Sequence, residues 1–121
     1  MMALSSQQQN LELPDFLKIR LADRLKVSIE QIFQFCQRWH ILELSLFGSV
    51  LREDFRPDSD VDILVVFLPE YHLTFHTWLA MQQQIEKIFG RKVDLTQKKL
   101  LKNPYTRAEI LKTHQVIYAA E

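Results

Sequence analysis

Two aspartates stand at the start of an apolar run in the middle of the chain. Asp60 and Asp62 precede and enter segment 61–67, whose β-branched and aromatic residues predict a strand buried on both faces. Because strand side chains alternate, both carboxylates are expected to project from one face. Adjacent carboxylates raise each other's pKa unless a cation neutralises them, and oxygen ligands suit a hard ion such as Mg²⁺. The pair therefore predicts a metal site.

A glycine–serine pair follows the preceding predicted strand, at 41–47. Gly48 lacks a Cβ, so the backbone there can approach a ligand closely, and Ser49 offers a hydroxyl and an amide. Arg52 lies about one helical turn further on, and a short helix predicted over 50–54 would bring its guanidinium to the same anion. Beside a metal-binding pair, these residues predict a site for a triphosphate and its metal.

Each of these features also has an ordinary structural explanation. Gly-Ser pairs end many strands, and the Asp and Ser side chains at 58–60 could hydrogen-bond their own loop backbone. The combination is more informative, because a chance loop rarely places paired carboxylates at the start of one buried strand and a Gly-Ser turn at the end of the previous one. We therefore interpret the two motifs as one active site.

The arrangement resembles the signature of the nucleotidyltransferases of the polymerase β superfamily, in which Gly-Ser, a spacer and Asp-x-Asp entering a strand follow one another. Here the spacer is ten residues long, from 50 to 59. The similarity covers 27–118 and is greatest with the minimal nucleotidyltransferases (MNT), the antitoxin halves of HEPN/MNT toxin–antitoxin pairs. Outside the two motifs it rests on the hydrophobic pattern and the order of elements. Phe47 stands where many members have a second glycine.

The resemblance implies catalytic roles for three carboxylates. Asp60 and Asp62 would hold two Mg²⁺ ions about 3.5–4 Å apart. Asp94, on a third predicted strand at 91–96, would complete the shell of the ion that activates the attacking hydroxyl. The residues implied to hold the β and γ phosphates of ATP are Gly48, Ser49, Arg52 and Ser59. The alternative for Asp94 is an exposed strand carboxylate paired with Lys92 or Lys98.

The same resemblance implies a function. AMP would pass from ATP to a hydroxyl, expected on a tyrosine, of a partner HEPN ribonuclease toxin, which would be neutralised. A domain this small is not expected to build an acceptor pocket with a second lobe, so the partner would bring its own hydroxyl. Two alternatives stay open. One is a non-catalytic antitoxin that binds and occludes its toxin, and the other is nucleotidyl transfer to a small molecule such as an aminoglycoside.

Composition limits the other function classes. The 121 residues predict one domain over 14–121 after a flexible tail at 1–13. Lys plus Arg and Asp plus Glu number 15 each, so no basic field favours nucleic acid as a direct ligand. The single Cys36 excludes an internal disulfide and fits a reducing compartment. Neither a membrane span nor a signal segment is evident, so we expect a cytoplasmic protein, whose oligomeric state the sequence leaves open.

Two other patterns in the sequence are weaker candidates for a site. His72 and His76 have the spacing of helical zinc ligands, but no third ligand lies near them in the sequence, which favours solvated histidines. The segment 21–28 has the outline of a helix-turn-helix unit, but no cluster of Arg and Lys marks a recognition helix. Neither is expected to carry the function.

The remaining pattern predicts an α/β (α+β) fold, with a small mixed or antiparallel sheet flanked by helices. Helices are predicted over 14–25, from Ser28 to His40 and over 77–89, with Gly90 ending the third and residues 82–84 facing solvent. A capping box formed by Thr106 and Glu109 predicts the start of a last helix. Segment 115–118 is predicted as either an edge strand or a docking tail.

Overall fold

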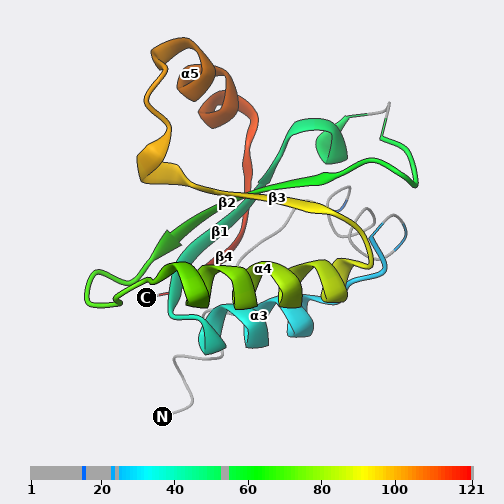
Figure 1. The fold of residues 1–121 in the computed structure, drawn as a ribbon. Helices are drawn as coiled ribbons and strands as arrows, with labels where there is room; N and C mark the ends of the chain where they lie inside the picture. The colour runs from blue at the N-terminus through cyan, green and yellow to red at the C-terminus, as the bar shows by residue number, and fades with distance from the viewer. Residues whose placement is uncertain (1–14, 16–22, 24, 53–54, 121) are drawn as a thin grey trace.

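A four-stranded mixed sheet forms the centre of the molecule (Figure 1). The computed structural model describes residues 15, 23, 25–52 and 55–120, so the predicted tail at 1–13 and nearly all of the predicted helix at 14–25 lie outside the described residues. The strand order is β3-β2-β1-β4, with β1 antiparallel to both β2 and β4, and β2 parallel to β3. The strands are β1 (Ile41–Phe47), β2 (Val61–Phe67), β3 (Val93–Gln97) and β4 (Gln115–Ala119). The predicted α/β class with a mixed sheet is confirmed.

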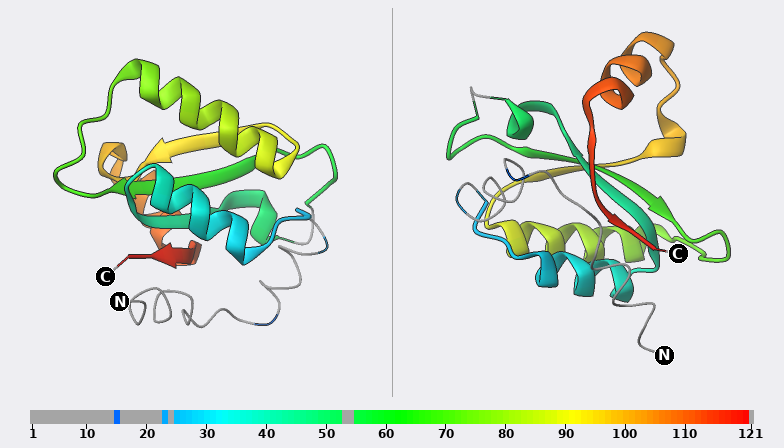
Figure 2. Two further views of the ribbon diagram at one scale, coloured as in Figure 1. Left: turned by 90° about the horizontal axis from the view of Figure 1, so that it is seen from below. Right: turned by 180° about the vertical axis from the view of Figure 1, so that it is seen from behind.

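The helices divide the two faces of the sheet unequally. Helices α3 (Ile29–Arg38) and α4 (Phe75–Phe89) lie side by side on one face, here called the covered face (Figure 2). Helix α5 (Pro104–Thr113) and the short 3₁₀ turn η2 (Gly48–Leu51) stand on the other side, here called the open face (Figures 1 and 2). A second 3₁₀ turn, η3 (Lys98–Leu100), links β3 to α5. Among the described residues, no helix combines the length and apolarity needed to cross a membrane.

The hydrophobic core lies between the covered face and its two helices. Alternate residues of β2 point into it, while the residues between them point to the open face. Burial of these apolar side chains is the main term that fixes the sheet against α3 and α4. Buried core residues from these elements include Ile32, Phe35, Leu44, Leu46, Val61, Ile63, Val65, Met81, Ile85 and Val93.

The helix ends test the capping predictions. Helix α3 begins as predicted, because Gln31 N donates to Ser28 Oγ (3.2 Å) and Ser28 N donates to Gln31 Oε1 (3.0 Å). Helix α4 ends, as predicted, at Gly90, whose φ of +67° is left-handed. The predicted short helix over 50–54 is wrong, since η2 ends at Leu51 and Arg52 is extended.

The predicted start of the last helix is also wrong. Helix α5 begins at Pro104, two residues before Thr106, and not at a capping box formed by Thr106. Asn103 is the N-cap, and its Oδ1 accepts from Tyr105 N (2.9 Å) and Thr106 N (3.2 Å). An Asn cap followed by a proline at the first helical position starts a helix more strongly than Thr106 does, because the proline φ is already helical.

Candidate active site

Three side chains stand in a row across the open face of the sheet. Phe47 of β1 is the partner of Asp62 in β2, and Asp62 is the partner of Asp94 in β3. Partnered residues of neighbouring strands project from the same face. Because Val61 and Ile63 on either side of Asp62 are fully buried in the core, the row faces away from α3 and α4. Parallel pairing thus brings together two carboxylates that are 32 positions apart in the chain.

Asp62 is the electrostatic centre of this row. It is half-buried, and its pKa is raised by burial, by the charge of Asp94 and by the charge of Asp60, while Arg52 lowers it. Asp60, exposed just before β2, and Asp94, exposed on β3, are therefore both near enough to repel it. One arginine offsets only part of this repulsion, so the group favours a ligand that brings positive charge.

Gly48 lies directly against the Asp62 carboxylate. Its φ is +77°, and a Cβ added there would stand 3.1 Å from Asp62 Cγ and would overlap Oδ2. Any other residue would therefore face both backbone strain and a collision with the carboxylate. The glycine of the Gly-Ser motif and the second aspartate of the Asp-x-Asp motif are thus in contact, as a single site requires.

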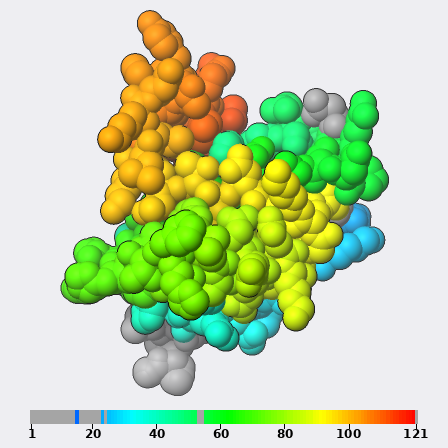
Figure 3. All heavy atoms as spheres, in the orientation of Figure 1, coloured from blue at the N-terminus to red at the C-terminus, as the bar shows by residue number. Residues whose placement is uncertain are grey.

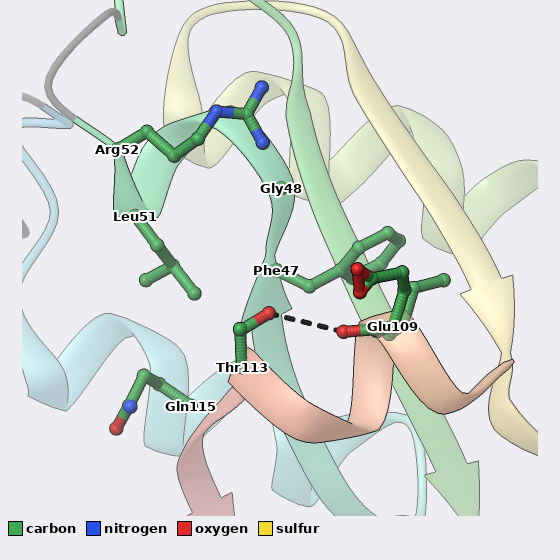
Figure 4. A pocket seen from close by; sticks show the side chains of 8 residues that line it. Phe47, Gly48, Leu51, Arg52, Glu109, Thr113 and Gln115 are labelled. Atoms are coloured by element: carbon green, nitrogen blue, oxygen red, sulfur yellow. Dashed lines mark hydrogen bonds between the residues drawn. The ribbon is translucent and has the colours of Figure 1, made fainter. Parts of the chain in front are cut away.

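Ser49 and Arg52 follow on η2. Ser49 is half-buried, and its carbonyl oxygen accepts from Arg52 N (2.9 Å), which closes the turn. The Arg52 side chain runs back along η2 on the side of Gly48 (Figure 4). Its guanidinium is close enough to Asp62 to lower that residue's pKa, so Arg52 belongs to the site although the predicted helix that would carry it does not form.

Ser59 helps to shape the loop in front of Asp60. Its Oγ accepts from Arg56 N (3.0 Å), and its own N–H donates to Arg56 O (3.0 Å). Arg91 then holds this loop, because its Nη1 donates to the carbonyl oxygens of Ser59 (3.1 Å) and Arg56 (3.3 Å), and its guanidinium lies 4.9 Å from the centre of the Phe55 ring. A phosphate-binding role for the Ser59 hydroxyl stays a prediction.

Gln82 and Glu86 of α4 hold β3, the strand that carries Asp94, and the sequence analysis predicted neither role. Glu86 Oε2 accepts from Val93 N (3.1 Å) and from Gln82 Nε2 (3.1 Å), and Gln82 Nε2 also donates to Val93 O (2.5 Å). These bonds fix the backbone immediately before Asp94. The prediction that residues 82–84 face solvent is therefore wrong for Gln82, and also for Gln84, whose Oε1 accepts from Trp39 Nε1 (2.7 Å). The available signal was the i, i+4 spacing of Gln82 and Glu86.

A cavity of about 540 Å³ opens beside this row, between η2 and α5. In the space-filling view the surface is hollowed between the orange α5 and the teal η2 (Figure 3). One wall includes Gly48 and Arg52, so the cavity is continuous with the Gly-Ser turn (Figure 4). Its lining residues are Phe47, Gly48, Leu51, Arg52, Glu109, Ile110, Thr113 and Gln115.

Comparison with known protein families identifies this arrangement. The sequence profile of the family described as "Polymerase beta, Nucleotidyltransferase" matches residues 30–121, most of the chain. The chain belongs to this nucleotidyltransferase family. The match contains both motifs and the strand that carries Asp94.

Named relatives of this nucleotidyltransferase have a common description. A Methanocaldococcus jannaschii protein, provisionally named a protein adenylyltransferase, is 37% identical over 73 residues, which cover 60% of this chain and 73% of the relative. The protein adenylyltransferase MntA of Thermococcus cleftensis is 32% identical over 82 residues, which cover 68% of this chain and 78% of the relative.

Solved structures share the fold of the nucleotidyltransferase. A toxin–antitoxin crystal structure with AMP-PNP has a TM-score of 0.62 at 15% identity, covering 78% of this chain and 76% of that one. A structure of the tri-AMPylated Shewanella oneidensis HEPN toxin in complex with an MNT antitoxin has a TM-score of 0.54 at 16% identity, covering 76% of this chain and 70% of that one. At these identities the likeness supports the fold alone.

The nucleotidyltransferase site suits Mg²⁺ as an ion shared with a substrate. Among the described residues, no group of three or more His, Cys, Asp or Glu side chains is placed to hold a metal ion. The two histidines with zinc-like spacing do not share a helix, because His72 precedes α4 and His76 lies within it. Mg²⁺ in nucleotide sites usually takes one or two carboxylates and completes its shell with water and phosphate oxygens. Mutually repelling carboxylates beside a glycine turn fit that donor set. The alternative ion pair between Asp94 and Lys98 does not form, because Lys98 pairs with Glu43 (3.1 Å).

Proposed function

We propose that this nucleotidyltransferase transfers AMP from ATP to a hydroxyl, expected on a tyrosine, of a HEPN toxin, and thereby acts as the antitoxin. The observation that carries the proposal is the contact between Gly48 and Asp62, with Asp94 as the partner of Asp62 in the sheet. This contact places the Gly-Ser turn directly against the carboxylate of Asp62, whose neighbour in the sheet is Asp94. The names of the relatives, and the AMPylated toxin in one structure of the same fold, support AMP as the group transferred.

The proposed chemistry assigns a task to each residue. Asp60, Asp62 and Asp94 would hold Mg²⁺, which would neutralise triphosphate charge and make the attacking hydroxyl more acidic. Gly48 lets the phosphates approach the backbone of η2, and Ser49 and Arg52 donate hydrogen bonds to them. Ser59, in the loop before Asp60, is the remaining candidate for a phosphate contact.

The proposed reaction is a displacement at the α-phosphorus of ATP. The acceptor oxygen forms a bond to this phosphorus, the bond to the bridging oxygen of the β-phosphate breaks, and pyrophosphate leaves. The acceptor proton passes to a carboxylate, for which Asp94 is the candidate because it is exposed on the outer strand of the described sheet. A hydroxyl on another protein can reach this position.

Intact-mass spectrometry of a HEPN toxin tests the proposal. The toxin is incubated with ATP, Mg²⁺ and one molecule of the wild-type protein per twenty toxin molecules. We expect every toxin molecule to gain mass in whole AMP units, because an enzyme turns over. EDTA or Asp62→Asn should prevent the gain, while Asp62→Asn should still co-purify with the toxin, because the substitution keeps the shape of the side chain and removes its charge. Neutralisation that needs equimolar protein, needs no ATP and survives Asp62→Asn would instead establish an occluding antitoxin.

A further inference from the structure

We infer that Arg91 is a positioning residue, which fixes Asp60 relative to the other carboxylates and thereby sets the affinity of the site for its metal ion. The inference rests on the proposed function. Asp60 is exposed and stands just before β2, so the place of its carboxylate follows from the backbone of the loop that carries it. The groups that hold this loop therefore decide where the carboxylate lies.

The Arg91 guanidinium holds the loop on the side before Asp60. Its Nη1 donates to the carbonyl oxygens of Ser59 (3.1 Å) and Arg56 (3.3 Å), and its central carbon lies 4.9 Å from the centre of the Phe55 ring. A planar guanidinium combines hydrogen bonds with stacking on an aromatic ring, which an ammonium group does less well. One half-buried side chain thus contacts three points of the loop.

Lys92 holds the backbone on the side after Asp60. Its carbonyl oxygen accepts from Val61 N (3.1 Å), at the point where the parallel pairing of β2 with β3 begins. This bond joins backbone atoms only, so it does not depend on the Lys92 side chain, which is exposed. Asp60 is therefore held on both sides by two consecutive residues, and only Arg91 uses its side chain to do so.

The same two residues lead into the strand that carries Asp94. Val93 begins β3 and is itself held to α4 by two side chains of that helix. Arg91 lies between this anchor and the loop, so its bonds tie the position of Asp60 to that of Asp94. An ion shared by carboxylates of two segments needs such a fixed spacing, and residues that orient metal ligands without touching the metal change its affinity by about 10–100-fold.

Charge and position predict opposite effects when Arg91 is replaced. A cation near the carboxylates repels Mg²⁺, so loss of its charge alone would leave metal affinity unchanged or raise it. Loss of the two carbonyl bonds lets Asp60 move and lowers metal affinity. Lys92→Met is the matched control, because it removes the same charge one residue away and keeps the backbone bond.

Calorimetry with ATP over a series of free Mg²⁺ concentrations tests the inference in the full-length protein without toxin. Arg91→Met should need at least about tenfold more Mg²⁺ than wild type for half-maximal ATP affinity. Arg91→Lys should need an intermediate concentration, and Lys92→Met should need no more than wild type. Arg91→Gln, whose side chain is too short for both carbonyls, provides the test if Arg91→Met fails to fold.

Two further measurements distinguish positioning from a general loss of structure. Hydrogen exchange in EDTA should become faster at the amide of Ser59, which donates to Arg56 O (3.0 Å), and stay unchanged at the amide of Val93. The initial rate of AMP transfer to the toxin should return to within about threefold of wild type at saturating Mg²⁺, because the reacting residues themselves are intact.

Three results would count against these assignments in different ways. An unchanged Mg²⁺ requirement in the folded Arg91 variants would overturn the inference. An equal increase in Lys92→Met would overturn it as well, since the bonds of the Arg91 side chain would then not be the cause. A wild-type protein that binds no ATP at any Mg²⁺ concentration would instead remove the proposed function.

Discussion

The two ends of the open face have cavities of similar size but very different electrostatics. At the basic end, near η3, two of the cations have partners in the protein: Lys98 pairs with Glu43 at 3.1 Å, and Arg107 Nη1 donates to the carbonyl oxygen of Lys98 at 3.1 Å. At the carboxylate end, Asp62 is surrounded by Asp94 and Asp60, which raise its pKa, with Arg52 as the offsetting charge.

The difference shows why cavity volume alone is a poor guide to a site. The volumes are about 590 Å³ at the basic end and about 540 Å³ at the carboxylate end, so volume ranks the end without the motif residues first. At the basic end the charge of Lys98 is paired with that of Glu43. At the carboxylate end Asp94 and Asp60 raise the pKa of Asp62 and Arg52 alone lowers it, so this is the end at which we expect a metal–nucleotide complex.

The largest difference between the two ends is expected in the catalytic rate. Asp94→Asn should reduce AMP transfer at least about 100-fold, because it removes a charge aimed at the reacting centre. Lys98→Met at the basic end should change the rate less than about twofold. Initial rates of AMP incorporation at saturating ATP measure both. A loss of less than about threefold in Asp94→Asn would return Asp94 to the role of an ordinary exposed carboxylate.

Alanine at the two left-handed glycines should have different effects at the carboxylate end and at the end of α4. Both Gly48 and Gly90 have a positive φ, so alanine at either should cost about 1–2 kcal/mol of folding free energy. Only Gly48→Ala also meets the Asp62 carboxylate, since nothing lies within 4 Å of a Cβ at Gly90. We expect an additional cost of about 1–3 kcal/mol for Gly48→Ala, together with loss of Mg²⁺–ATP binding. Urea unfolding and calorimetry measure the two effects, and intact ATP binding in Gly48→Ala would contradict the proposed contact.

The smallest expected effect is on stability without metal. The pKa of Asp62 is raised in the folded protein, so the folded state binds its proton more tightly than the unfolded state does, and stability falls as pH rises through this range. Asp62→Asn should therefore unfold at a higher temperature than wild type at pH 7 in EDTA. The advantage should disappear at a pH low enough to protonate Asp62 in both states, and Mg²⁺ should reduce it by stabilising the wild type. A variant less stable than wild type at pH 7 in EDTA would contradict this assignment.

Local patterns predict the elements of this fold well. The strands β1 and β2 have the predicted bounds, and the Ser28 cap and the Gly90 terminus form as predicted, because each depends on neighbours in the sequence. At the start of α5, Asn103 followed by Pro104 is a stronger local signal than the predicted capping box on Thr106, and the helix begins there. The short helix predicted over 50–54 failed because η2 starts earlier, at Gly48 itself.

The geometry of the site was less accessible to sequence reasoning. The motifs predict which residues belong together, but the overlap of a Gly48 Cβ with Asp62 and the pairing of Asp62 with Asp94 depend on register between separate strands. The supporting residues Arg91 and Glu86 contact backbone atoms of distant segments, and such bonds leave little trace in side-chain periodicity.

The bonds from α4 to Val93 also bear on solubility. An outer strand exposes unpaired N–H and C=O groups along its free side, and these can recruit a strand from another molecule and begin aggregation. In β3 the N–H and C=O of Val93 are already engaged by Glu86 and Gln82. A strand from another molecule therefore cannot pair with the first N–H and C=O groups of this five-residue strand. The contacts that hold the strand of Asp94 in place thus also protect its edge from pairing with the edge of another sheet.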